Sequence, residues 1–155
     1  MNYTIYEDTI IFNSDFNEPL DNYIDIIKKY KKLIFSNYDD YELCIKTNNT
    51  YISKYNTNYK KSKFNQPLSS SLNNLTQLKQ LTFGWYFNQS LGSSLNNLTQ
   101  LVKLTFGLEF NQPLGDSLNN LTQLKQLTFD YRFNQPLGSS LDNLIQLEVL
   151  TFGLE

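Results

Sequence analysis

A repeat of 23 residues constrains the fold of this chain more than any other feature. Residues 64–155 divide without a gap into consecutive units, each close to F-N-Q-P-L-x-x-S-L-x-N-L-x-Q-L-x-x-L-T-F. The four units are residues 64–86, 87–109, 110–132 and 133–155. A chain with a period of this length forms a stack of similar coils, because a single coil cannot bury its own apolar residues.

The repeat continues in weaker form toward the N-terminus. The segment Phe16-Asn17-Glu18-Pro19-Leu20 matches the start of a unit, so residues 16–38 are a degenerate fifth unit. Residues 1–15 contain Ile10-Ile11-Phe12 where a unit has its Leu-Thr-Phe, so we expect them to supply half a unit. The chain is therefore expected to form one continuous solenoid, with residues 1–63 as its degenerate N-terminal part.

Residues 39–63 fit the repeat least well. They contain two β-rich runs, Tyr41–Ile45 and Tyr51–Tyr55, on either side of the turn-prone Thr47-Asn48-Asn49. Such runs around a turn are typical of a small hairpin, and an irregular coil is the alternative.

Two spacings within each unit predict its local structure. Leu81, Thr82 and Phe83 alternate apolar, polar and apolar, which predicts a short strand with the threonine pointing outward. Upstream, leucines recur at every third position from Leu72 to Leu81, which favours a short helical or 3₁₀ turn. The sequence thus predicts an α/β solenoid of 23-residue coils, each with a short strand and a short helical or 3₁₀ turn.

Composition excludes several classes of function. The formal net charge is −2 and the pI is about 5.1, without the excess of lysine and arginine that nucleic-acid binding requires. No apolar run approaches the roughly 18 residues that cross a bilayer, so we expect no membrane association. Cys44 is the single cysteine, and no apolar run follows a basic start. We expect an intracellular, cytoplasmic protein, in a host cell if the chain is viral.

The units resemble FNIP repeats, a variant of the leucine-rich repeat frequent in amoebae and in the large DNA viruses that infect them. The defining tetrad stands here as Phe-Asn-Gln-Pro at 64–67, 110–113 and 133–136, and as Phe-Asn-Gln-Ser at 87–90. The resemblance implies a leucine-rich-repeat-like, right-handed, horseshoe-shaped solenoid and a role in protein–protein interaction. Members of this family often carry an N-terminal F-box that recruits a ubiquitin ligase, but residues 1–40 are typical of repeat sequence instead.

One asparagine recurs where the chain leaves each strand. Its side-chain amide is suited to hydrogen-bond the backbone of the turn and of the next coil, so we predict a structural ladder rather than a binding site. The ladder comprises Asn65, Asn88, Asn111 and Asn134.

The outward face of the predicted sheet supplies the candidate protein-binding residues. They are the threonine row Thr82, Thr105, Thr128 and Thr151, the neighbouring Gln80, Lys103 and Gln126, and the variable positions Tyr86, Glu109 and Arg132. Exposed aromatic residues beside an arginine are typical of binding hot spots. The alternative for the residues Trp85, Leu108, Tyr131 and Leu154 is that they point inward and fill the coil.

No candidate catalytic or metal-binding group stands out. The chain has no histidine to activate Cys44, which we expect to be a small buried apolar residue. We predict no enzyme activity, no metal and no cofactor. The predicted function is a repeat scaffold that binds another protein, and the alternative is a substrate-recognition adaptor of a ubiquitin ligase without its own F-box.

Self-association through the last coil is a further prediction. Leu144, Leu147, Leu150 and Phe152 belong to a coil that no later unit covers in this sequence, so we expect them to be half exposed.

Overall fold

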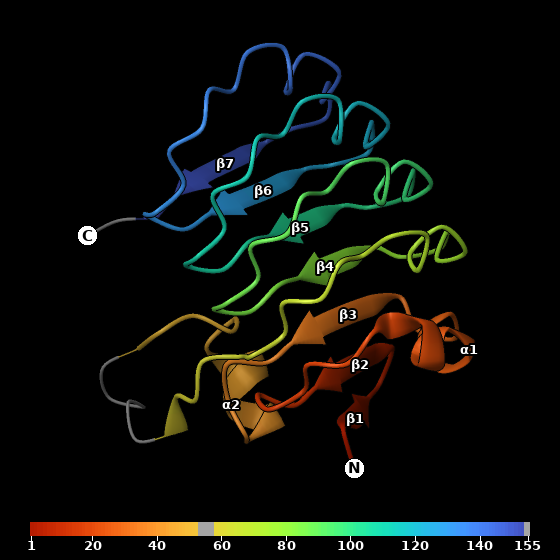
Figure 1. Cartoon of the computed structure of the whole chain (residues 1–155), viewed down its shortest axis with the longest axis vertical. Helices are drawn as coiled ribbons and strands as arrows, with labels where there is room; N and C mark the ends of the chain where they lie inside the picture. Colours follow the sequence, from red (N-terminus) through yellow and green to blue (C-terminus); the bar gives the residue numbers. More distant parts are fainter. Residues whose placement is uncertain (53–57, 154–155) are drawn as a thin grey trace.

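The computed structural model describes residues 1–52 and 58–153. Its strands form one sheet in chain order, in which β1 pairs antiparallel with β2 and every later pair is parallel (Figure 1). The elements are β1 Tyr3–Tyr6, β2 Thr9–Phe12, the 3₁₀ helix η1 Leu20–Tyr23, α1 Ile24–Ile27, β3 Lys32–Phe35, α2 Tyr41–Lys46, β4 Gln80–Thr82, β5 Lys103–Thr105, β6 Gln126–Phe129 and β7 Val149–Phe152.

The predicted register of the solenoid is present in the sheet. The leucine of each Leu-Thr-Phe segment pairs with the same leucine of the next coil, as Leu81 pairs with Leu104 and Leu104 with Leu127. Residues 9–12 form strand β2 at the position expected for the half unit. The α/β solenoid predicted from the period is confirmed, and β1 adds an antiparallel strand that the repeat did not predict.

The core consists of leucines and of two columns of stacked phenylalanine rings. In one column, Phe83 lies 5.6 Å from Phe106, and Phe106 lies 5.3 Å from Phe129, between ring centroids. The second column stands beside it, with Phe87 only 3.8 Å from Phe83. All of these rings are buried, so each coil is completed by contacts with its two neighbours.

The turn predicted before each strand is present as a series of 3₁₀-type turns. In the described part of residues 64–155, an amide bonds to the carbonyl three residues earlier, as that of Leu75 does to Leu72, and no regular helix forms. The Asn97 side chain donates a hydrogen bond to the Asn73 carbonyl of the preceding coil. Such bonds join the turns of neighbouring coils.

The prediction of a β-strand at residues 41–45 is wrong, because these residues belong to the helix α2. The Asp40 side chain caps this helix by accepting hydrogen bonds from the amides of Glu42 and Leu43. The turn expected at 47–49 is present, with positive φ angles of 54° at Asn48 and 60° at Asn49. Of the second run, Tyr51–Tyr55, residues 51 and 52 are not in a strand and the last three lie outside the described residues.

An insertion, residues 39–63, separates β3 from the next coil without interrupting the stack of coils. Strand β3, before this segment, pairs directly with β4, which follows it. Phe16 and Phe64 stack 5.8 Å apart across the insertion, as corresponding rings of consecutive coils do elsewhere. The helix α2 of the insertion lies over one face of the sheet (Figure 1).

A candidate protein-binding groove on the sheet

The outward face of the sheet carries one column of paired residues that changes character along the stack. In the N-terminal coils the column consists of Ile11 and Ile34, and in the later coils the same register is occupied by threonines. The isoleucines are buried under the insertion, in a cluster with Tyr38 and Cys44. The insertion thus covers the isoleucine half of this face and leaves the threonine half to line a hollow.

The threonine row is less exposed than the sequence predicted. Thr82 and Thr105 retain only 3% and 8% of their surface, whereas Thr128 and Thr151 are half-buried. The cause is the insertion, whose Asn48 reaches far enough over the sheet to accept a hydrogen bond from the Lys103 ammonium. Burial lowers the pKa of Lys103.

A groove with a volume of about 640 Å³ lies between the insertion and the C-terminal coils. This volume falls in the range of pockets that hold small ligands or a few side chains of a partner. The threonine row lines it together with Asn37, Asn48, Asn49, Thr50, Tyr51, Tyr59, Lys61, Phe83, Trp85, Phe106, Gly107, Leu108, Phe129, Asp130, Tyr131 and Gly153.

One wall of the groove is aromatic. The ring of Tyr59 lies edge-on to Tyr51 at 5.3 Å and to Trp85 at 5.6 Å. The Lys61 ammonium sits over the Trp85 ring, 4.5 Å from its centroid, in a cation–π contact. Burial is the main cause that raises the pKa of Tyr59.

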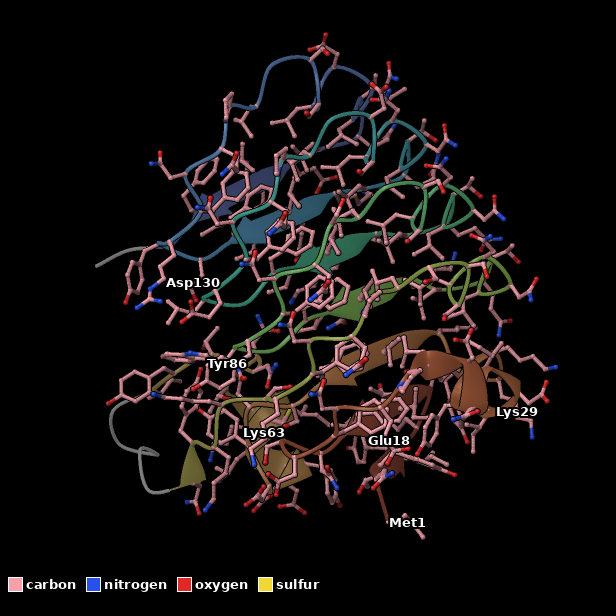
Figure 2. The ribbon with its side chains drawn as sticks, viewed as in Figure 1. Met1, Glu18, Lys29, Lys63, Tyr86 and Asp130 are labelled. Carbon is pink, nitrogen blue, oxygen red and sulfur yellow. The ribbon has the colours of Figure 1, made fainter. Side chains whose placement is uncertain are left out.

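Asp130 and Tyr131 line the groove from the turn that follows β6. Asp130 follows β6 at the edge where the parallel strands end, and Lys29 lies at the opposite edge (Figure 2). Its carboxylate accepts a hydrogen bond from the Tyr131 amide at 2.7 Å. The Tyr131 side chain is 54% exposed, so the groove has an accessible aromatic rim here.

The alternative in which the variable positions fill the coil is wrong for Tyr131, which is exposed and lines the groove. Trp85 and Leu108 also line the groove and lie outside the main core cluster, although Leu108 is buried. The fourth position, Leu154, lies outside the described residues.

The groove unites only part of the candidate set. All four threonines line it, whereas Gln126 and Tyr86 are exposed elsewhere and Gln80 donates a hydrogen bond to Thr82. Glu109 and Arg132 pair with each other at 2.7 Å, outside the groove. Sequence reasoning missed Tyr51, Tyr59, Lys61 and Asp130, although Asp130 is visible in the repeat as a substitution at a glycine position.

The asparagine ladder is present as hydrogen bonds between coils. The Asn65 side-chain oxygen accepts from the Asn88 amide at 2.9 Å, and that of Asn88 accepts from the Asn111 amide at 2.9 Å. The last step, from the Asn134 amide to Asn111, measures 2.8 Å. A glutamine of each following coil joins the ladder, as Gln89 does by donating to the Asn65 side-chain and backbone oxygens. These glutamines recur with the period, but sequence reasoning predicted no role for them.

The remaining chemistry of the described residues is sparse. Cys44 is buried, and burial raises the pKa of its thiol to about 11. Among residues 1–52 and 58–153, no three His, Cys, Asp or Glu side chains are grouped to hold a metal ion. No helix in this part of the chain is both long and apolar enough to cross a membrane.

Comparison with solved structures finds leucine-rich-repeat proteins. CroV588, a circular leucine-rich-repeat protein of a giant virus, aligns with 99% of this chain at 25% sequence identity and a TM-score of 0.47. Internalin InlF of Listeria monocytogenes aligns with 94% of it at 21% identity and a TM-score of 0.47. This chain covers 25% of CroV588 and 47% of the internalin. No family model and no curated protein matches the sequence.

Proposed function

We propose that this chain is a non-catalytic repeat scaffold that binds another protein in the groove over the threonine half of its sheet. The observation that carries the proposal is the groove itself, which combines a hydroxyl-lined floor with the accessible rings of Tyr51 and Tyr131. Tyrosine and tryptophan supply large contact area and a polar tip, and they are enriched at the centres of protein interfaces.

The structural roles of the repeat residues support this assignment. The recurring phenylalanines stack on one another, and the recurring asparagines and glutamines form the hydrogen-bonded ladder. The residues that recur therefore hold the coils together. Residues that differ between coils, such as Trp85 and Tyr131, line the groove. The same division of roles supports assignment of the units to the FNIP type of leucine-rich repeat.

The test is capture of a partner by the full chain and by two lysine variants. Thr128→Lys places a long charged side chain on the groove floor at a half-buried position, where the structure accommodates it at the surface. Ser139→Lys adds the same charge at an exposed turn and serves as the matched control. The proposal expects a partner lost by Thr128→Lys and kept by Ser139→Lys. Equal capture by both variants, with unchanged far-UV circular dichroism, contradicts it.

The ubiquitin-ligase adaptor is distinguished by the identity of the captured proteins. Residues 3–35 provide strands β1 to β3 of the sheet, with η1 and α1 between them, so an F-box function has to come from another chain or segment. Recovery of Skp1-like and cullin subunits together with the groove-dependent partner favours the adaptor. Recovery of the partner without them favours a plain binding module.

Self-association of the 155-residue chain is a second binding mode that one observation favours. Leu150 and Phe152 of β7 are 39% and 40% exposed, and β7 lies at the edge of the sheet. An edge strand with exposed apolar residues pairs readily with another chain. Light scattering over a concentration series tests this: we expect dimers or larger species, and a monomer at roughly 100 μM contradicts it.

A further inference from the structure

Asp130 departs from the repeat at a position where packing favours glycine. The corresponding residues of the other regular coils are Gly84, Gly107 and Gly153. A Cβ atom on Gly107 would lie 2.0 Å from the Gly84 carbonyl oxygen, and one on Gly153 would lie 2.2 Å from the Tyr131 amide nitrogen. Backbone atoms cannot yield to such contacts cheaply, so a side chain here requires the turn to change.

The turn after β6 does differ from its neighbours. In the preceding coils the Tyr86 amide bonds to Ser62 and the Glu109 amide bonds to Trp85, each in the coil before. Within the described residues the equivalent amide, that of Arg132, makes no such backbone bond. The turn at Asp130 thus lacks this backbone hydrogen bond between coils. The Asp130 carboxylate does not compensate for it, since it accepts its hydrogen bond from the adjacent Tyr131 amide.

The Asp130 carboxylate also has no cationic partner in residues 1–52 and 58–153. Two cations are close in sequence or space, but each is engaged elsewhere: Arg132 pairs with Glu109, and Lys61 lies over the Trp85 ring. Asp130 lines the groove together with Tyr51 and Tyr59. An unpaired carboxylate in a partly enclosed groove attracts a positive charge from outside the chain.

The aromatic wall is suited to the same charge. Tyrosine and tryptophan rings attract an ammonium or guanidinium group through their electron-rich faces. Lys61 already makes such a contact with Trp85, while Tyr51 and Tyr59 are not engaged with a cation among the described residues. A cationic side chain that enters the groove therefore meets both aromatic rings and a carboxylate.

The floor of the groove offers a separate binding element. Thr128 and Thr151 line it and are half-buried. Backbone amides and carbonyls of an extended segment are suited to such a row of hydroxyls, because they provide donors and acceptors at short intervals along the chain.

We propose that the groove binds an extended segment of the partner protein and that this segment places a lysine or arginine side chain against Asp130. The proposal rests on the proposed function, which it makes specific. Tyr51 and Tyr59 contact the hydrocarbon stem and the charge, and Thr128 and Thr151 pair with the backbone of the segment.

The test selects random peptides, displayed on phage, on the full immobilised chain and measures the affinity of the selected peptides by calorimetry. We expect enrichment of lysine or arginine at one position and at least a tenfold loss of affinity with Asp130→Asn. Replacing the basic residue of the peptide by norleucine causes a similar loss. The matched control Asp142→Asn, which removes an exposed carboxylate outside the groove, leaves the affinity unchanged.

A second variant separates binding from folding. Asp130→Gly restores the residue found at the equivalent positions, so we expect it to melt within a few degrees of the parent chain and yet to bind as weakly as Asp130→Asn. Thr151→Val removes a hydroxyl of the groove floor with little change in volume, and we expect it to weaken binding of the same peptides without changing their preference for a basic residue.

The possible failures are distinguishable. In one outcome, the selected peptides lack a basic residue, bind the Asp130→Asn variant as well as the parent chain, and fail to bind the Thr128→Lys variant. This outcome overturns the inference about Asp130 and leaves the proposed function intact. Peptides that tolerate Thr128→Lys overturn the groove as the binding site. Selection of no peptide, together with saturable binding of a neutral oligosaccharide such as cellohexaose, overturns both.

Discussion

The two halves of the outward sheet face show how one repeat geometry produces either a second core or an open groove. Over β2 and β3 the outward column is isoleucine, and the insertion packs on it as a second, smaller core. Over β5 to β7 the column is threonine, and the insertion reaches only its border. The backbone register is the same in both halves. The outward side chain therefore decides whether this face is covered from within the chain or left open.

Exchanging the outward residues between the halves should give the largest effect. Ile34→Thr places a hydroxyl among Tyr38 and Cys44 and removes buried methyl groups, so we expect a loss of about 2–3 kcal/mol in the free energy of unfolding. Thr128→Ile lies on the open half and should change stability by no more than about 0.5 kcal/mol. Urea denaturation measures both, and equal effects of the two substitutions contradict the comparison.

The pH dependence of stability should also distinguish the covered half. The native thiol of Cys44 has a pKa of about 11, and its ordinary value is about 9. Above pH 9 the unfolded chain loses this proton while the native chain keeps it, so the contribution to stability is present below pH 9 and is lost as the pH approaches 11. We expect Cys44 to account for about 2 kcal/mol of this loss.

Thermal melts of the parent chain and of Cys44→Ala across this pH range isolate the contribution. The variant lacks the thiol, so its melting temperature should fall less steeply with pH than that of the parent. Parallel curves for the two proteins would mean that the thiol is not protected from solvent.

The asparagine ladder should contribute equally to stability wherever a later coil uses it. Asn88→Ala removes the acceptor of the Asn111 amide and of the Gln112 side chain, and should cost about 1–2 kcal/mol. Asn134 accepts no such bond within the described residues, so Asn134→Ala is the matched control and should be nearly neutral. A thermal melt of Asn88→Ala that matches the control refutes the ladder as a stabilising element.

The smallest expected effect is a gain in stability at the first regular coil. Ser69 has a φ of 45°, which is a left-handed conformation. At the equivalent positions of the later coils, glycine adopts this conformation, as Gly92, Gly115 and Gly138. Ser69→Gly removes this strain and should stabilise the chain by about 0.5–1 kcal/mol. The substitution Gly115→Ser should destabilise it by a similar amount. A loss of stability on Ser69→Gly contradicts this equivalence.

The period alone predicts the strands, their register and the inward leucines and phenylalanines, because these features repeat with every coil. It does not predict the path of residues 39–63, which carry no period and whose position depends on packing against Ile11 and Ile34. The signal was nevertheless present, since two isoleucines stand where later coils have threonine. A face that is apolar in one half and polar in the other indicates that something covers the apolar half.

The candidate site was predicted less well for a related reason. The threonine row was identified from alternation, but the groove wall combines this row with Tyr51, Tyr59 and Lys61, which come from the non-repeating segment. Asp130 is visible as an exception among glycines, yet its meaning depends on the close approach of neighbouring backbones. The repeated positions thus predict the solenoid, whereas the candidate groove is lined largely by residues that depart from the repeat.

The fluorescence of Trp85 tests the central claim most directly, because it is the single tryptophan of the sequence and lies in the groove wall. Titration of the full chain with the captured partner, or with a selected peptide free of tryptophan, should shift its emission saturably at the affinity found by calorimetry. The same titration of Thr128→Lys should give no shift. Tight binding without any change in Trp85 emission, retained in Thr128→Lys, would place the interface outside the groove and contradict the account.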